Sequence, residues 1–147
     1  MTGGVIRKHW VYTIGGEADP PPEDWIVSWE HHRTEMWFPG TKRPVAISFG
    51  DRAVIFGGRA RGFLAAVEVV GDGPEENGDE YGRQQFPYVM RHKLLVAKLG
   101  DRNVASSEAA GITLRRIQRG PHTQINETEY EKAVEGLLEA ASRSARG

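Results

Sequence analysis

Short runs of β-branched and aromatic residues, each closed by glycine or proline, recur along this chain of 147 residues. The run VIRKHWVYTI (5–14) ends at Gly15-Gly16, and the run RAVIFGG (52–58) follows a turn at Gly50-Asp51. Such side chains fit a pleated, half-buried surface, so these runs predict strands. The length is that of a single domain with a real core, so residues 1–147 are expected to form one domain.

The other segments complete the expected architecture. Further strands are predicted at MWF (36–38), GFLAAVEVVGDG (62–73), FPYVMRHKLLVAKLG (86–100) and ITLRRIQRG (112–120). A Gly- and Arg-rich connection at 58–61 predicts an antiparallel hairpin between the strands on either side of it. The polar segment 71–85 has no apolar period and is expected to be a loop.

Helices are predicted at three places. Residues 18–33 form a segment entered through prolines, which a first helical turn tolerates, and residues 101–111 predict a short helical turn. A final helix is predicted after Asn126, because Glu129 completes a capping box and apolar residues recur at helical spacing beyond it. The expected class is α+β: five or six strands in a small mixed barrel with helices at its margins.

Composition limits the location and the partners of the chain. There is no cysteine, no long apolar run and no apolar signal-peptide core, so a soluble cytoplasmic protein is expected. The net charge is only −1, but charge is segregated: residues 33–61 carry six cations against two carboxylates, and residues 91–119 carry seven against two. Carboxylates gather in 72–80 and 127–139 instead. Segregated charge can give one positive face to a nearly neutral protein, although two solvated faces of different sign are equally compatible.

Motifs for catalysis or for cofactors are not found in the sequence. The histidines are scattered or adjacent, which does not fit convergent metal ligands, and neither a Gly-x-Ser-x-Gly motif nor a phosphate loop occurs. The paired carboxylates of segment 72–80 have nothing apolar beside them to raise a pKa. No metal, no cofactor and no catalytic residue is therefore predicted.

Aromatic and basic residues remain as candidates, and the stretch EMWFPGTKRP (35–44) combines both. Trp37 precedes a Pro-Gly turn and two cations, Lys42 and Arg43. The Trp37 ring is either core packing or the wall of a cavity for a flat, anion-linked ligand such as a nucleobase. Trp25 and Trp29, at helical spacing, are more typical of core residues.

Five stretches of this chain, taken in order, resemble an EVE domain of the PUA-like superfamily, which is related to YTH and ASCH domains. They are KHWVYTIGG (8–16), the segment from Glu35 to Gly58, GFLAAVEVVGD with the later EYGRQQFPYVMRHKLLV, and the closing INETEYEKAVEGLL. The resemblance implies a PUA-like distorted mixed β-barrel with flanking helices. It also implies a side pocket that receives a flipped, often methylated, base between aromatic rings.

The residues that the resemblance assigns to the base pocket come from separate segments. They are Trp37, Tyr12, Thr13, Phe56, Gly57, Phe86 and Tyr88. Ile14 departs from the polar residue that relatives often carry there. Lys42, Arg43, Arg59 and Arg61 flank the implied mouth and are expected to contact phosphates, which position a strand without specifying its sequence.

The resulting hypothesis is a non-catalytic module that binds modified DNA or RNA, with an effector protein acting in trans as a further partner left open. The energetics agree with this hypothesis, because stacking on an aromatic side chain contributes about 1–3 kcal/mol per base to binding. One alternative is an ASCH-like amidohydrolase of acylated nucleosides that uses Thr13 and Lys42. Another is a protein-interaction module whose pocket takes a small ligand or a peptide.

Overall fold

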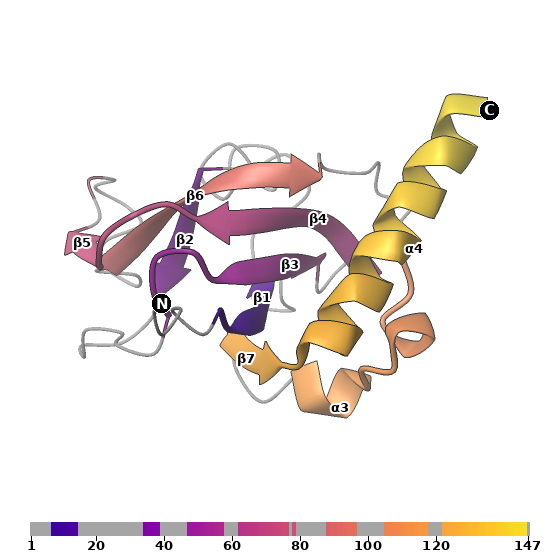
Figure 1. Cartoon of the computed structure of the whole chain (residues 1–147), viewed down its shortest axis with the longest axis horizontal. Helices are drawn as coiled ribbons and strands as arrows, with labels where there is room; N and C mark the ends of the chain where they lie inside the picture. The colour runs from indigo at the N-terminus through magenta and orange to yellow at the C-terminus, as the bar shows by residue number, and fades with distance from the viewer. Residues whose placement is uncertain are drawn as a thin grey trace, which may run out of the picture.

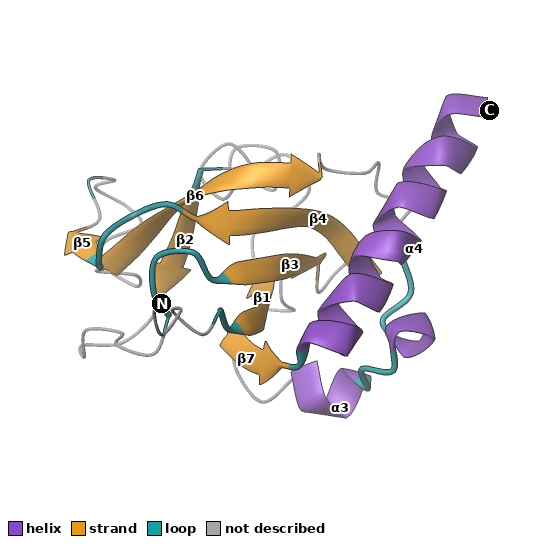
Figure 2. Cartoon of the chain, in the orientation of Figure 1, coloured by secondary structure: helices purple, strands orange, loops and turns teal. Residues whose placement is uncertain are grey.

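The computed structural model describes residues 7–14, 34–38, 47–57, 62–76, 78, 88–96, 105–117 and 122–146. Its elements are shown in Figures 1 and 2, and in chain order they are β1 (His9–Ile14), β2 (Glu35–Phe38), β3 (Arg52–Gly57), β4 (Gly62–Val69), β5 (Glu75–Glu76), β6 (Tyr88–Val96), the 3₁₀ turn η1 (Glu108–Ala110), α3 (Leu114–Ile117), β7 (His122–Ile125) and α4 (Glu127–Arg146).

One curled, mixed sheet contains all seven described strands, in the order β2-β6-β4-β3-β1-β7, with β5 paired to β6. β1 and β3 are parallel, and the other pairs are antiparallel. The long helix α4 crosses one face of this sheet beside β3 and β4 (Figure 1). The α+β class and the barrel-like sheet with marginal helices are therefore confirmed.

Alternation along the central strands divides the core between the two faces of the sheet. Val11 and Val54 belong to the cluster that includes Tyr130 and Leu137 of α4, and both of these valines are fully buried. Their neighbours Tyr12 and Ile55 belong to a second cluster that contains no α4 residue. Because successive side chains on a strand point to opposite faces, the two clusters lie on opposite sides of the sheet.

A buried aspartate holds the beginning of β1 against the beginning of β3. Asp51 is 1% exposed, and its carboxylate accepts hydrogen bonds from the Lys8 amide (3.0 Å), the Ser48 amide (3.0 Å) and Trp10 Nε1 (3.1 Å). Gly50, just before it, has a φ of +89°, which favours glycine. The predicted Gly50-Asp51 turn is thus confirmed, and it is also the point at which two segments distant in sequence are tied together.

The capping box predicted at the start of the last helix is confirmed. The Glu129 amide donates to Asn126 Oδ1 (2.7 Å), and the Asn126 amide donates to Glu129 Oε1 (3.0 Å). These two bonds satisfy amides that the first turn of a helix otherwise leaves without a partner.

The strand predicted at 112–120 is wrong. Residues 114–117 form the helical turn α3 instead, and Thr113 Oγ1 accepts a hydrogen bond from the Arg116 amide (3.2 Å). Ile112 and Ile117 are both fully buried, so the apolar residues follow a turn and not the period of a strand. A short apolar pattern cannot distinguish the two, and the threonine cap favours the turn here.

Two short strands were not predicted. β7 lies just before α4 and pairs with β1, and β5 lies within the segment expected to be a polar loop. The other predicted strands are confirmed where the structure describes them, as is a helical turn within 101–111. The helix predicted at 18–33 and the connection at 58–61 lie outside the described residues. None of the described helices combines the length and the apolar character needed to cross a membrane.

Candidate functional site

The parallel pairing of β1 and β3 brings three of the predicted pocket residues to one end of the sheet. Thr13 is the register partner of Phe56, and Ile14 is the register partner of Gly57. Because parallel strands end at the same edge, Thr13, Phe56 and Gly57 lie together although they are far apart in sequence.

The Thr13 hydroxyl is the most informative atom at this edge. Oγ1 is buried, and it has no hydrogen-bond partner among the residues that the structure describes. A buried hydroxyl without a partner costs about 1–3 kcal/mol, so such groups are rare unless something else uses them. Gly57, which pairs one position further along, is buried and has no side chain.

Two other predicted pocket residues, Tyr12 and Phe56, are core side chains. Tyr12 is 2% exposed and stacks on His122, with ring centroids 4.8 Å apart and planes at 11°. Phe56 is 4% exposed and meets Phe63 edge to face at 5.7 Å. The two rings belong to clusters on opposite faces of the sheet, so the structure does not bring them together as two sides of one cage.

Trp37 and Tyr88 lie on neighbouring strands at another part of the sheet, but they are not register partners. β2 pairs with β6, and Trp37 is opposite Val89 while Phe38 is opposite Tyr88. Tyr88 is partly buried and packs against the same apolar cluster that contains Tyr12. In sheet order β4 and β3 separate this pair of strands from β1. The Trp37 side chain, Phe86 and the four predicted phosphate contacts (Lys42, Arg43, Arg59 and Arg61) lie outside the described residues.

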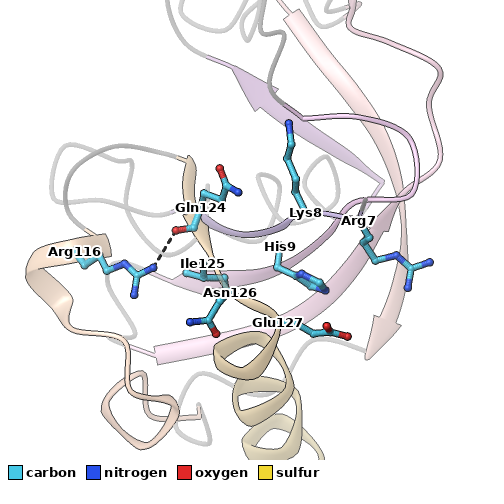
Figure 3. Close-up of a pocket in the computed structure, with 8 residues that line it drawn as sticks. All are labelled: Arg7, Lys8, His9, Arg116, Gln124, Ile125, Asn126 and Glu127. Carbon is cyan, nitrogen blue, oxygen red and sulfur yellow. Dashed lines mark hydrogen bonds between the residues drawn. The ribbon is translucent and has the colours of Figure 1, made fainter. Parts of the chain in front are cut away.

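A hollow of about 460 Å³ opens at the N-terminal end of α4 (Figure 3). The start of β1, the end of β7, α3 and the first turn of α4 all contribute to its lining. The lining residues are Arg7, Lys8, His9, Arg116, Gln124, Ile125, Asn126 and Glu127. None of them belongs to the predicted site, because no local motif connects single residues from four elements.

His9 presents a neutral imidazole to this hollow. The residue is only 6% exposed, and its ring lies 4.8 Å from the ring of Tyr130. Burial lowers the pKa of His9 below its ordinary value, and Glu127 opposes that shift. The imidazole lies in the hollow beside Glu127 (Figure 3), where a group that enters the hollow can reach it.

Arg116 is fixed in position at the rim of the same hollow. Its guanidinium donates to Glu129 Oε2 and to the Gln124 carbonyl (3.1 Å), the second of which is drawn in Figure 3. The Glu129 carboxylate therefore serves both the capping box and Arg116. The described residues bring no three histidine, cysteine, aspartate or glutamate side chains together as a metal site.

His122 is the first residue of β7, and its side chain is half-buried beside Tyr12. Burial lowers the pKa of His122 to about 3, so its ring is neutral in the folded protein at physiological pH. The stacked Tyr12 ring covers one side of it. His122 is not among the residues that line the hollow.

Comparison with known proteins gives a likeness of fold alone. No protein-family model matches the sequence, and no curated protein matches it. Three solved structures are similar in fold over most of the chain. Rpa0253 of Rhodopseudomonas palustris has a TM-score of 0.53 at 13% identity, over 89% of this chain and 94% of its own. A hypothetical protein of Leishmania major has a TM-score of 0.51 at 15% identity, over 90% and 96%. Atu2648 of Agrobacterium tumefaciens has a TM-score of 0.51 at 14% identity, over 88% and 92%.

Proposed function

We propose that this chain is a non-catalytic nucleic-acid-binding module of the EVE type, with a PUA-like barrel, that takes a modified and flipped base into an aromatic pocket. The observation that supports this proposal most directly is the buried Thr13 hydroxyl at the paired ends of β1 and β3, which has no partner among the described residues. The sequence resemblance places that same residue in the base pocket. A base-edge nitrogen or oxygen that forms a hydrogen bond with this hydroxyl removes the cost of leaving the hydroxyl buried without a partner.

The energetics of a flipped base explain why such a contact is needed. Removing a base from its stack costs a few kcal/mol, and stacking on one aromatic ring returns about 1–3 kcal/mol. Burying a methyl group adds only about 0.8 kcal/mol. Stacking on Trp37 therefore has to be supplemented by polar contacts such as the one proposed for Thr13, which also favour a base of the right edge.

The buried rings then have a supporting function in this proposal. Tyr12 and Phe56 are too deeply packed to contact a ligand directly, and they fix the backbone that carries Thr13 and Gly57. Tyr88 directly precedes Val89, the register partner of Trp37, and so points to the other face of the sheet; it is therefore not assigned as a second ring beside Trp37. Lys42, Arg43, Arg59 and Arg61 are proposed to hold phosphates at the mouth.

The test is a binding titration with labelled oligonucleotides, with and without 5-methylcytosine or N6-methyladenine, at several salt concentrations. We expect binding that weakens with salt, improves with one modification, and loses that preference in Trp37→Ala. Leu138→Ala, which truncates an exposed side chain of α4, is the control for a surface substitution.

Two results would contradict the proposed function. If Trp37→Ala binds the modified and unmodified oligonucleotides as the parent chain does, no aromatic pocket at this position recognises a base. If the chain releases an acyl group from an acylated nucleoside, it is an enzyme of the ASCH-like kind instead.

A further inference from the structure

A row of polar and charged residues crosses four neighbouring strands, and its first member, His9, lies beside the N-terminal end of α4. His9, Arg52, Glu68 and Lys93 are successive register partners on β1, β3, β4 and β6. Register partners point to the same face of a sheet. That face is the one on which α4 packs, because the His9 ring contacts Tyr130.

Two further cations extend this row at its outer side. Arg7 precedes β1, and its Nε donates to the Gly50 carbonyl (2.8 Å). Arg91 lies two residues before Lys93 on β6 and therefore on the same face. We name the set Arg7, Arg52, Arg91 and Lys93 the basic strip.

Glu68 organises the basic strip from its centre. Its carboxylate is 18% exposed and lies 3.1 Å from Arg52 Nε, 3.5 Å from Lys93 Nζ and 3.6 Å from a terminal nitrogen of Arg7. Three cations around one carboxylate leave a surplus of two positive charges. The single carboxylate holds the three cationic side chains at fixed positions without neutralising them.

The cations at both ends of the strip are open to solvent. The side chains of Arg7, Lys93 and Arg91 are 43%, 59% and 63% exposed. Arg91 bonds to Glu75 (2.7 Å), but Glu75 is itself 49% exposed, and an exposed ion pair of this kind contributes little. A stronger anion can therefore replace Glu75 at Arg91.

The strip continues into the hollow at the N-terminal end of α4. Arg7 belongs to both, Lys8 lies beside it, and Arg116 adds positive charge across the hollow (Figure 3), against the one lining carboxylate, Glu127. His9 also lines the hollow and is 6% exposed. An N–H donor that is neutral and already desolvated suits an anionic oxygen, because no proton has to be gained or lost on binding.

We propose that the basic strip and the hollow form a track for the phosphates of one nucleic-acid strand. This inference rests on the proposed function and adds to it a second surface, separate from the base pocket. The dimensions fit: four strands about 4.8 Å apart span about 14 Å. A stacked strand places about four phosphates over that length, at about 3.4 Å each. A small anion would need only one such cluster, whereas cations in a row match a repeating polyanion.

The test compares two exposed arginines that each pair with a glutamate. Arg91 pairs with Glu75 in the strip, and Arg143, 57% exposed, pairs with Glu139 near the other end of α4 (3.4 Å). Fluorescence anisotropy with a labelled single-stranded oligonucleotide gives the dissociation constant of each variant across salt. Melting temperatures confirm that each variant is folded.

We expect the double variant Arg91→Gln/Lys93→Gln to reduce the slope of log K against log salt by about 1.4, because each phosphate that a cation no longer neutralises lowers the slope by about 0.7. Near 0.15 M salt this corresponds to binding about tenfold weaker. Arg143→Gln should leave the slope unchanged. In the parent chain, adding oligonucleotide should shift the NMR resonances of the His9 imidazole.

The remaining outcomes separate this inference from the proposed function. One outcome contradicts the phosphate track alone. In it the parent chain binds, Trp37→Ala loses the preference for a modified base, and the double variant keeps the salt slope of the parent chain. The proposed base pocket is then retained. If the parent chain binds no oligonucleotide, both are overturned. If the strip cations direct binding to phosphatidylserine vesicles and not to the oligonucleotide, the assignment to nucleic acid is overturned.

Discussion

Replacing Thr13 with valine should stabilise the free protein and weaken its binding to nucleic acid. Valine has nearly the same shape as threonine and an equal preference for strands, so packing at the end of β1 is kept. Only the hydroxyl is lost, and in the free protein that hydroxyl is buried without a partner among the described residues.

The magnitude follows from two contributions. Leaving a buried hydroxyl without a hydrogen bond costs about 1–3 kcal/mol, and burying a methyl group in its place contributes about 0.8 kcal/mol. The unfolded chain regains part of this when it solvates the hydroxyl, so we expect a net gain of about 1 kcal/mol in the free energy of unfolding. For a domain of this length, about 1 kcal/mol raises the melting temperature by about 2–4 °C.

The binding of the preferred oligonucleotide should change in the opposite direction. A neutral hydrogen bond to the base edge contributes about 0.5–1.5 kcal/mol, so Thr13→Val should weaken binding by about threefold to tenfold. Urea denaturation of the free chain and anisotropy titration of the same preparation measure both effects. A merely structural threonine would change only the first.

Thr123→Val is the matched control. Thr123 Oγ1 donates to the Arg116 carbonyl at 3.5 Å, so this hydroxyl has a hydrogen-bond partner in the folded protein. Its loss should lower the free energy of unfolding by about 0.5 kcal/mol. The reasoning is refuted if Thr13→Val lowers the free energy of unfolding by more than about 1 kcal/mol. Unchanged affinity in that variant would remove Thr13 from the base pocket.

Three further predictions concern the stability of the fold. Between about pH 6.5 and pH 3 the unfolded chain binds a proton at His122 that the folded chain does not, so the free energy of unfolding should decrease by about 1.4 kcal/mol for each unit by which the pH is lowered. Urea denaturation at several pH values should show a flatter pH dependence for His122→Gln. An equally steep dependence in that variant would contradict a lowered pKa of His122. Asp51→Ala leaves three donors without their acceptor, the buried Trp10 Nε1 and the half-buried amides of Lys8 and Ser48, and should cost about 3–5 kcal/mol and change Trp10 fluorescence. Asn126→Ala removes the cap of α4 and should cost about 1 kcal/mol by denaturation, whereas no loss would mean that the cap is not formed in solution.

Local pattern was enough to predict the central strands and the last helix. β3, β4 and β6 are runs of apolar and β-branched residues bounded by turn residues, and Asn126 with Glu129 marks the start of α4. α3 was predicted as a strand because three apolar residues in a short segment fit either period. β7 was missed because its stability comes from pairing with β1, which is a distant segment.

The candidate site was predictable only in part, for a similar reason. The resemblance identified Thr13 and Phe56, but their pairing depends on a parallel contact between distant strands that no local signal encodes. That Tyr12 and Phe56 face opposite sides follows from the alternation of side chains once the two strands are placed. The row from Arg7 to Lys93 is assembled from single residues on four segments, and the segregation of charge along the chain indicated it only in general terms.

The central position of β1 has a consequence for the biosynthesis of the chain. β1 leaves the ribosome before the other described strands, yet it lies between β3 and β7, and β7 is made just before α4. Until β7 emerges, an apolar strand that contains Val11 and Tyr12 keeps one open edge, and open edges are templates for pairing with other chains. Completion of this sheet therefore waits until β7 has been translated, and the edge of β1 stays exposed to other chains until then.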